Sequence, residues 1–119
     1  MKKASALTLG VAAIAAGVFS SCSSVNCTAE LRSSLVVTVL NGAATEICDA
    51  TVTARDGGFL ATLHVYGNTP PCNYDGPYER RGTYTVTAQA NGQSTSMAGI
   101  QVTGDQCHVH TRDVTLTLG

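Results

Sequence analysis

From residue 34 onward, the chain consists of short segments in which apolar and polar side chains alternate, separated by turn-forming residues. In one such segment Tyr84, Val86 and Ala88 alternate with threonines and a glutamine. An alternation with a period of two places the apolar side chains on one face of a β-strand. No segment here has the 3.6-residue period of an amphipathic helix, so we predict an all-β fold.

Turn signals divide this region into seven expected strands. Asp56-Gly57 and Asn91-Gly92 are typical of tight β-hairpin turns, and a long loop is expected over 67–77, where all three prolines lie. Short strands at regular intervals are typical of a β-sandwich. The expected strands cover residues 35–40, 50–55, 59–65, 78–79, 83–89, 93–103 and 108–118.

The alternation changes phase inside the last expected strand. Val109 is apolar at an odd position, whereas Val114, Leu116 and Leu118 are apolar at even positions. One extra residue must be accommodated between them if all four are to face the core. We therefore predict a β-bulge over 111–113.

The first 22 residues have the features of an export signal. Lys2 and Lys3 precede an apolar stretch over 6–19, which as a helix would span about 21 Å, short of the roughly 30 Å hydrocarbon core of a bilayer. Ser20-Ser21-Cys22 resembles the end of a bacterial lipoprotein signal, in which the cysteine is acylated and becomes the new N-terminus. We expect a cleaved signal peptide at 1–21 and a lipidated Cys22 with its tether at 22–33. The alternative is an ordinary secretory signal in which Cys22 is incidental.

The same resemblance indicates a destination. Ser23 after the lipidated cysteine resembles the default signal for the bacterial outer membrane, and several acyl chains on one cysteine form a stable membrane anchor. We expect a lipid-anchored protein of the cell envelope. Whether the domain faces the periplasm or the exterior stays open.

The charge of the exported part excludes some partners. Without Lys2 and Lys3, five arginines stand against eight acidic residues, a net charge of −3. Binding to nucleic acid requires a basic surface, so we expect no nucleic-acid partner. The sequence also has no GxGxxG, Walker A, HExxH, GxSxG or paired CxxC motif. We expect neither a cofactor nor an enzymatic activity.

Four cysteines remain if Cys22 is acylated. An even number in an exported chain predicts two disulfide bonds, and four cysteines allow three pairings. The spacings of 21, 24 and 35 residues lack the short pairs typical of zinc sites. These cysteines are Cys27, Cys48, Cys72 and Cys107.

The region from 33 to 118 resembles a carboxypeptidase regulatory-like domain. The resemblance rests on four stretches and is most specific at Gly82-x-Tyr84-x-Val86, which leads into the Asn91-Gly92 hairpin. It implies a seven-stranded, transthyretin-like Greek-key β-sandwich over 34–119, non-catalytic and accessory to envelope proteins. The stretches are Leu-Val-Val-Thr-Val at 35–39, Ile-Cys-Asp-Ala-Thr-Val-Thr-Ala at 47–54, the segment 72–86 and Cys-His-Val at 107–109.

The implied topology also suggests how the cysteines pair. Successive strands of this fold alternate in direction, which would place Cys27 and Cys107 at one end and Cys48 and Cys72 at the other. We therefore expect the disulfide bonds Cys27–Cys107 and Cys48–Cys72.

Tyrosines and histidines are the candidate site residues. Tyr74 and Tyr78 are expected to be exposed on the long loop, where binding residues often lie. His108 and His110 lie on one face of a strand and could share a metal ion, but Val109 between them should point inward, so both are expected to be solvent-exposed surface residues. Tyr84 is expected in the core, with its hydroxyl bonded to backbone.

For the acidic and basic residues in the loops, we expect a structural role rather than a binding role. Asp49, Asp75, Glu79 and Asp105 could approach a calcium ion, but no DxDxD spacing occurs. The run Glu79-Arg80-Arg81 is expected to be a turn with a surface ion pair.

Three functions follow as hypotheses. The first is a non-catalytic envelope lipoprotein that acts as a structural or protein-interaction module. The second is a glycan- or peptidoglycan-binding module that stacks sugars on Tyr74 and Tyr78. The third, which we favour least, is a small metal site at His108 and His110.

Overall fold

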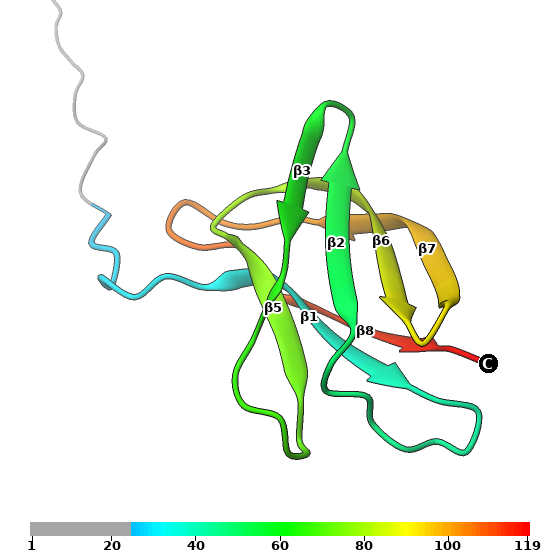
Figure 1. The fold of residues 1–119 in the computed structure, drawn as a ribbon. Helices are drawn as coiled ribbons and strands as arrows, with labels where there is room; N and C mark the ends of the chain where they lie inside the picture. The colour runs from blue at the N-terminus through cyan, green and yellow to red at the C-terminus, as the bar shows by residue number, and fades with distance from the viewer. Residues whose placement is uncertain (1–24) are drawn as a thin grey trace, which may run out of the picture.

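The computed structural model describes residues 25–119, and every regular element in this part is a β-strand (Figure 1). The predicted all-β fold is therefore confirmed for the described residues. The eight strands are β1 (Ser33–Leu40), β2 (Thr51–Asp56), β3 (Phe59–Thr62), β4 (His64–Val65), β5 (Asn73–Tyr78), β6 (Gly82–Ala90), β7 (Gln93–Val102) and β8 (Arg112–Thr117).

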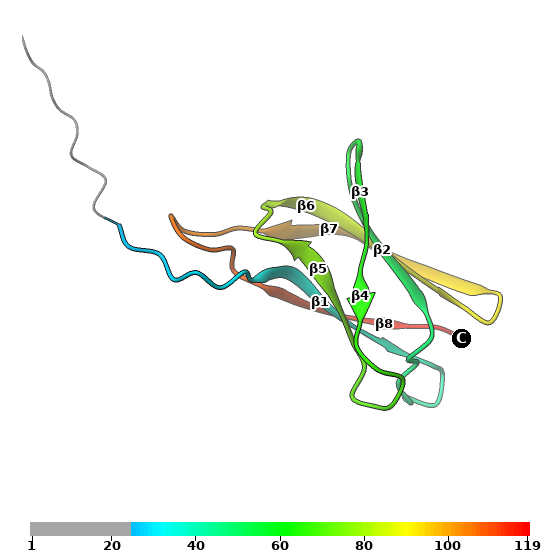
Figure 2. The same ribbon diagram turned by 60° about the vertical axis from the view of Figure 1, so that its left-hand side comes forward.

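The strands form two four-stranded sheets in a β-sandwich-like arrangement (Figure 2). One sheet has the order β4-β5-β1-β8 and the other the order β3-β2-β6-β7. β1 and β8 are parallel, and all other neighbouring strands are antiparallel. β1 therefore lies inside its sheet, bonded to β5 on one side and to β8 on the other.

Both sheets contribute to one hydrophobic core. The alternating residues of β1 and β8 that face inward pack in one cluster with those of β2 and β6, as the period of two predicts. Burial of this apolar surface is the main favourable contribution to folding. The core members on these four strands include Leu35, Val37, Val39, Val52, Ala54, Tyr84, Val86, Ala88, Val114 and Leu116.

The structure has eight strands rather than seven because the expected strand over 59–65 belongs to two sheets. β3 pairs with β2, whereas β4 pairs with β5 in the other sheet. Leu63 lies between them, is buried, and donates its N–H to the carbonyl of Val52 over 2.8 Å. A continuous alternation in sequence gives no sign that the chain changes sheets at this point.

The expected long loop over 67–77 is partly wrong, because its second half is strand β5. Tyr74 pairs with Val37 of β1, and Gly76 pairs with Leu35. Pro77 has no N–H to donate, but β4 pairs only with Tyr74 and Asp75, so Pro77 lies where β5 has no second neighbour. Glycine and proline in this segment predicted a loop. A strand tolerates them, however, where it has a neighbouring strand on one side only.

The predicted bulge over 111–113 is also wrong. β8 begins at Arg112 and pairs with β1 in continuous register, whereas Val109 forms an isolated bridge to Gly104. The alternation changes phase because Val109 and the apolar residues of β8 pair with different parts of the chain. The register shift in the described residues lies between β6 and β7, where β7 has one extra residue beside Gly99, which has a φ of 73°.

Two disulfide bonds join the expected partners. Cys27 pairs with Cys107 and Cys48 pairs with Cys72, with Cα–Cα distances of 5.2 and 5.3 Å. Because β1 runs from the first bond toward the second and β5 returns, the two bonds lie at opposite ends of the domain. The Cys27–Cys107 bond fixes the segment before β1 beside the 103–111 connection, which is orange in Figure 1.

Candidate functional site

Tyr74 is not an exposed ligand-binding residue, contrary to the prediction. Its side chain is fully buried, and its hydroxyl donates to the carbonyl of Ile47 over 2.7 Å and accepts from the N–H of Ala50 over 3.0 Å. Burial raises the pKa of this phenol. Tyr74 therefore fixes the segment around Cys48 to β5 and cannot stack against a ligand from solvent.

Tyr78 is exposed as predicted, and its neighbour is Tyr66 rather than Tyr74. The two side chains are 44% and 66% exposed. Hydrogen bonding with Tyr66 is the main cause that raises the pKa of Tyr78 to about 12, and desolvation, the charge of Asp75 and hydrogen bonding with Asp75 act in the same direction. The ring of Tyr66 also packs edge-on against His64, with 4.3 Å between the centroids. Tyr66 was not predicted as a site residue, although an inward Val65 implies that His64 and Tyr66, on either side of it, share the outer face.

Asp75 lies at the base of these aromatic residues. It is the register partner of His64 on β4 and of Val36 on β1. One carboxylate oxygen, Oδ2, accepts a hydrogen bond from the hydroxyl of Ser33 over 2.9 Å. The other, Oδ1, is buried and has no hydrogen-bond partner within the described residues. We call His64, Tyr66, Asp75 and Tyr78 the tyrosine–carboxylate cluster.

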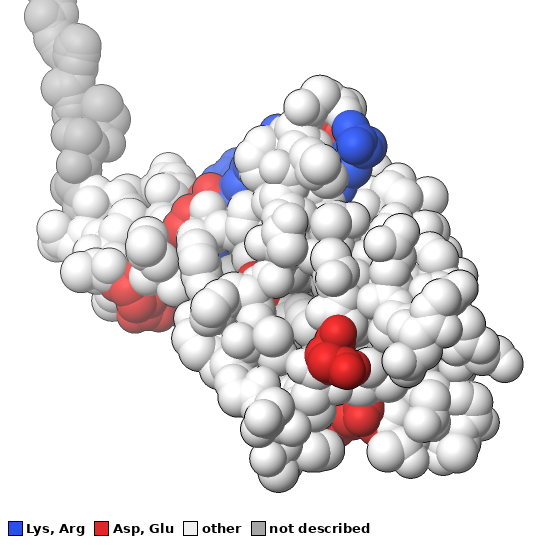
Figure 3. All heavy atoms as spheres, in the orientation of Figure 1, with Lys and Arg blue, Asp and Glu red and all other residues white. Residues whose placement is uncertain are grey.

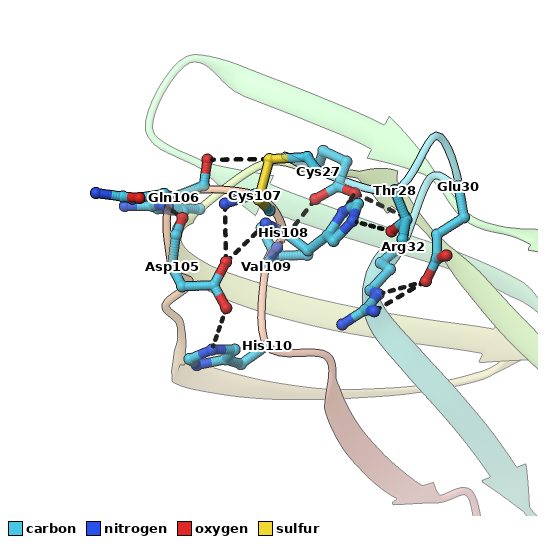
Figure 4. Close-up of a disulfide and its surroundings, with 12 residues drawn as sticks. Cys27, Thr28, Glu30, Arg32, Asp105, Gln106, Cys107, His108, Val109 and His110 are labelled. Carbon is cyan, nitrogen blue, oxygen red and sulfur yellow. Dashed lines mark hydrogen bonds and ion pairs between the residues drawn. A yellow bond between two sulfur atoms is a disulfide. The ribbon is translucent and has the colours of Figure 1, made fainter. Parts of the chain in front are cut away.

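His108 and His110 do not form a pair, and the prediction that both are exposed is wrong for His108 (Figure 4). His108 is only 8% exposed, and its Nδ1 bonds to Oε2 of Glu79 while its Nε2 bonds to the hydroxyl of Thr28 over 2.8 Å. His110 is exposed and lies 3.6 Å from the carboxylate of Asp105. Within residues 25–119, no group of three or more His, Cys, Asp or Glu side chains is placed to hold a metal ion.

Glu79 connects several segments of the chain at this end of the molecule. Besides His108, its carboxylate accepts hydrogen bonds from the N–H groups of Arg32 over 3.1 Å and Val109 over 2.9 Å. The hydrogen bond with His108 is the main cause that lowers the pKa of Glu79. Glu79 therefore fastens the segment that enters β1 to the 103–111 connection, next to the Cys27–Cys107 bond.

Asp105 organises the turn that carries Cys107. Its Oδ1 accepts from the N–H groups of Cys107 over 2.8 Å and His108 over 2.9 Å. These two bonds lower the pKa of Asp105 to about 2. The oxygens of Glu79 and Asp105 thus serve internal donors, which leaves them poorly suited to the calcium role considered from sequence.

Arg80 forms a partly buried ion pair rather than the expected surface pair. Its guanidinium lies 3.1 Å from Asp56 and stacks 3.8 Å from the ring centroid of Phe59. The hydroxyl of Tyr84 donates to the carbonyl of Arg80 over 2.8 Å, so the prediction of a core tyrosine bonded to backbone is confirmed. These contacts join the β2–β3 hairpin to the start of β6.

A polar groove lies at the opposite end, near the Cys48–Cys72 bond. It consists of two adjoining hollows of about 450 and 590 Å³ that share Asp49 and Asn91. The lower part of the face in Figure 3, over the loops at this end, has acidic but no basic side chains in view. The other polar side chains that line it are Glu46, Asn68, Gln89, Gln93, Thr45, Thr51 and Ser94, and Ile47, Pro70 and Ala90 also contribute.

Comparison with known proteins gives no relative from which a role could be transferred. No family model, curated protein or solved structure matches the chain. Cys22 and the signal at 1–21 lie outside the described residues. Across 25–119, the structure contains no helix with the length and apolarity needed to cross a membrane.

Proposed function

We propose that this chain is a non-catalytic lipoprotein of the bacterial cell envelope that acts as a structural or protein-interaction module. In this proposal Cys22 carries the acyl chains, residues 22–33 are the tether, and residues 34–119 form the domain. The domain would be a transthyretin-like Greek-key sandwich of the carboxypeptidase regulatory-like type. The outer membrane is the proposed location, and the domain's partner would be an envelope protein.

The observation that carries the proposal is the position of the Cys27–Cys107 bond. Cys27 follows Cys22 by five residues and is covalently fixed at one end of the domain. An anchor at Cys22 would hold this end near the membrane. β1 has eight residues, so at about 3.3 Å per residue the end with the polar groove would be about 26 Å farther out. A module built in this way presents its distal loops to partners in the envelope.

Metabolic labelling tests the anchor. Cells that produce the protein are grown with a clickable palmitate analogue, and we expect label on the mature chain and fractionation with membranes. Cys22→Ser should abolish the label, whereas Cys48→Ser, which removes another cysteine, should leave it. An unlabelled, freely soluble wild-type protein would contradict the proposal.

A glycan-binding module is the second candidate, and the polar groove favours it. Carboxylate and amide side chains such as those of Asp49, Asn91 and Gln89 can accept and donate hydrogen bonds to sugar hydroxyls. The stacking platform expected from Tyr74 and Tyr78 is absent, because Tyr74 is buried. Peptidoglycan sedimentation tests this candidate: Asn91→Ala and Gln89→Ala should reduce pelleting, and Gln101→Ala, on another part of the surface, should not. Equal pelleting of all three variants would rule out the groove.

A further inference from the structure

β7 lies at the edge of its sheet. In the order β3-β2-β6-β7, it pairs with β6 on one side and, within residues 25–119, with no strand on the other. An edge of this kind presents unpaired backbone N–H and C=O groups that can pair with a strand of another molecule. Figure 2 shows the β6–β7 hairpin, in yellow, extending beyond the neighbouring strands. β7 is therefore placed to continue its sheet into a second molecule.

The fold covers the second half of β7 and leaves the first half open. Ile100 and Val102 are buried, and the guanidinium of Arg112 on β8 donates to the carbonyl of Gln101 over 2.8 Å. The residues over 93–98, in contrast, are exposed or half-buried. A partner strand would therefore pair with this first half.

The turn before β7 determines which backbone groups of the strand point outward. The two residues of the 91–92 turn have φ values of 54° and 75°, as in a type I′ hairpin, so Ala90 and Gln93 form the hydrogen-bonded pair that closes it. Hydrogen-bonded and non-hydrogen-bonded pairs alternate along an antiparallel ladder. The N–H and C=O groups of Ser94 and Ser96 therefore point away from β6.

The edge of β7 lacks the features by which edge strands usually avoid pairing. Such strands are short or carry charged side chains. β3 has four residues, β4 has two, and β8 contains Arg112 and Asp113. β7 has ten residues, and the chain contains no acidic, basic or histidine residue from 82 to 104. Because the domain has five arginines against eight acidic residues, two copies repel each other least at such an uncharged edge.

A second copy of β7 fits this edge in an antiparallel arrangement about a two-fold axis. An axis at Ser96 places the two copies of Ser96 opposite each other, and Met97 of each copy opposite Thr95 of the other. Met97 points to the core face, because it pairs with the buried Val86, yet its side chain is 43% exposed. Contact with Thr95 of the second copy would remove part of this apolar surface from water. The edge therefore complements itself in hydrogen bonding and in charge.

We propose that two copies of this chain associate through β7, which pairs with its counterpart over 94–98 and joins the two β3-β2-β6-β7 sheets into one. The outward backbone groups of Ser94 and Ser96 form the new hydrogen bonds. This association goes beyond the proposed lipoprotein function and does not depend on the anchor at Cys22, because the contact lies away from the Cys27–Cys107 end. Palmitate labelling and dimerisation can thus succeed or fail separately.

Sedimentation velocity of the full chain in excess detergent micelles measures the association. A short ladder buries less surface than a standard interface, so we expect a dimer with a dissociation constant on the order of 100 μM. Ser96→Lys places like charges opposite each other and should weaken dimerisation about fivefold. Thr115→Lys adds the same charge at an exposed position of β8 and should dimerise like the wild type. A wild-type chain that stays monomeric, or equal dimerisation of the two variants, would overturn the proposal.

A charge exchange separates loss of association from loss of folding. Ser96→Glu alone should be weakened as Ser96→Lys is. An equimolar mixture of the two variants should dimerise at least as strongly as the wild type, because opposite charges now meet at the axis. A mixture that associates no better than either variant alone would overturn the proposal.

Disulfide cross-linking in cells locates the contact. Directly opposite residues of an antiparallel ladder have Cα atoms about 4.5–5.5 Å apart, which lies within the range that a disulfide bond spans. Ser96→Cys should therefore give a covalent dimer on non-reducing gels, whereas Thr115→Cys should not. Cross-linking of Ser96→Cys to a different protein instead of to itself would overturn the assignment to a second copy. Equal dimers from both variants would overturn the placement of the contact at β7 and the proposal with it.

Discussion

Tyr74 and Tyr84 are both fully buried, and each uses its hydroxyl to hold backbone that lies outside its own strand. Tyr74 secures the segment before β2, and Tyr84 secures the turn before β6. Buried phenols of this kind contribute large apolar rings and satisfy backbone groups that strands leave unpaired. At the scale of single residues, these hydroxyls therefore add hydrogen bonds to the stability that apolar packing supplies.

Removal of the Tyr74 hydroxyl should destabilise the domain. Tyr74→Phe leaves the carbonyl of Ile47 and the N–H of Ala50 without their partner, and we expect a loss of about 1–3 kcal/mol in the free energy of unfolding. Urea denaturation measures this loss. Tyr78→Phe, at an exposed position, is the control and should stay within about 0.5 kcal/mol of the wild type. Equal stability of the two variants would contradict the role assigned to Tyr74.

Gly82 is required by close packing. A Cβ at this position would collide with the carboxylate of Asp56, which is held by Arg80. We expect Gly82→Ala to cost about 1–3 kcal/mol in unfolding free energy. Gly58→Ala is the matched control, because a Cβ there has no atom within 4 Å. A Gly82→Ala variant as stable as Gly58→Ala would show that the Arg80–Asp56 pair can move aside.

Among the elements, the 103–111 connection is the one whose structure depends most on ionised side chains. Glu79 and Asp105 accept backbone N–H groups from this connection, and His108 lies buried against Glu79. The strands, in contrast, depend on ladder hydrogen bonds and apolar packing. The connection should therefore respond to acid before the sheets do.

Acid should destabilise the folded state through Asp105 and Glu79. Both carboxyls have pKa values below their ordinary values in the folded state, Asp105 about 2. Their contribution is present above the ordinary carboxyl pKa values and is lost as the pH falls through the lower folded values. We expect the melting temperature to fall between about pH 4.5 and pH 2. Asp105→Asn should flatten this dependence, and Asp113→Asn, an exposed control, should not; identical profiles for the two would contradict the assignment.

Local alternation in the sequence was sufficient to predict β2 and β6, which keep one face on the core along most of their length, whereas β1 is apolar on both faces and β7 has buried residues only at its C-terminal end. The prediction failed where pairing with a strand distant in sequence, rather than local alternation, determines the structure. The change of sheet at Leu63 and the strand through Pro77 depend on neighbours that the local pattern does not encode. The burial of His108 depends on Thr28 and Glu79, which are 80 and 29 residues away. The tyrosine–carboxylate cluster was missed for the same reason.

For the molecule as a whole, the two disulfide bonds are the largest single constraints. They span 80 and 24 residues in sequence and lie at opposite ends of one small core. Small domains commonly rely on such bonds to compensate for a limited hydrophobic core. The pairing could be inferred because the resemblance implied strand directions, whereas the spacing alone left three possibilities.

Loss of either disulfide should lower stability, with different local effects. The chain-entropy model gives upper values of about 4.5 kcal/mol for Cys27–Cys107 and 3.5 kcal/mol for Cys48–Cys72. Thermal melting of the double serine variants measures the loss. Hydrogen exchange should increase over 27–32 only in the Cys27→Ser/Cys107→Ser variant, because the Cys48–Cys72 bond holds a different end. Melting curves unchanged by reductant would contradict the expectation.

The position of β1 determines how the domain would resist mechanical load. A pull on an anchor before Cys27 passes through the Cys27–Cys107 bond into the 103–111 connection as well as into β1. Along β1 the load runs parallel to the strand, so the hydrogen bonds to β5 and β8 are sheared together rather than peeled one at a time. Because the 103–111 connection continues into β7 and β8, the covalent bond would share the load between the two sheets, and reduction of the bond would leave β1 to carry it alone.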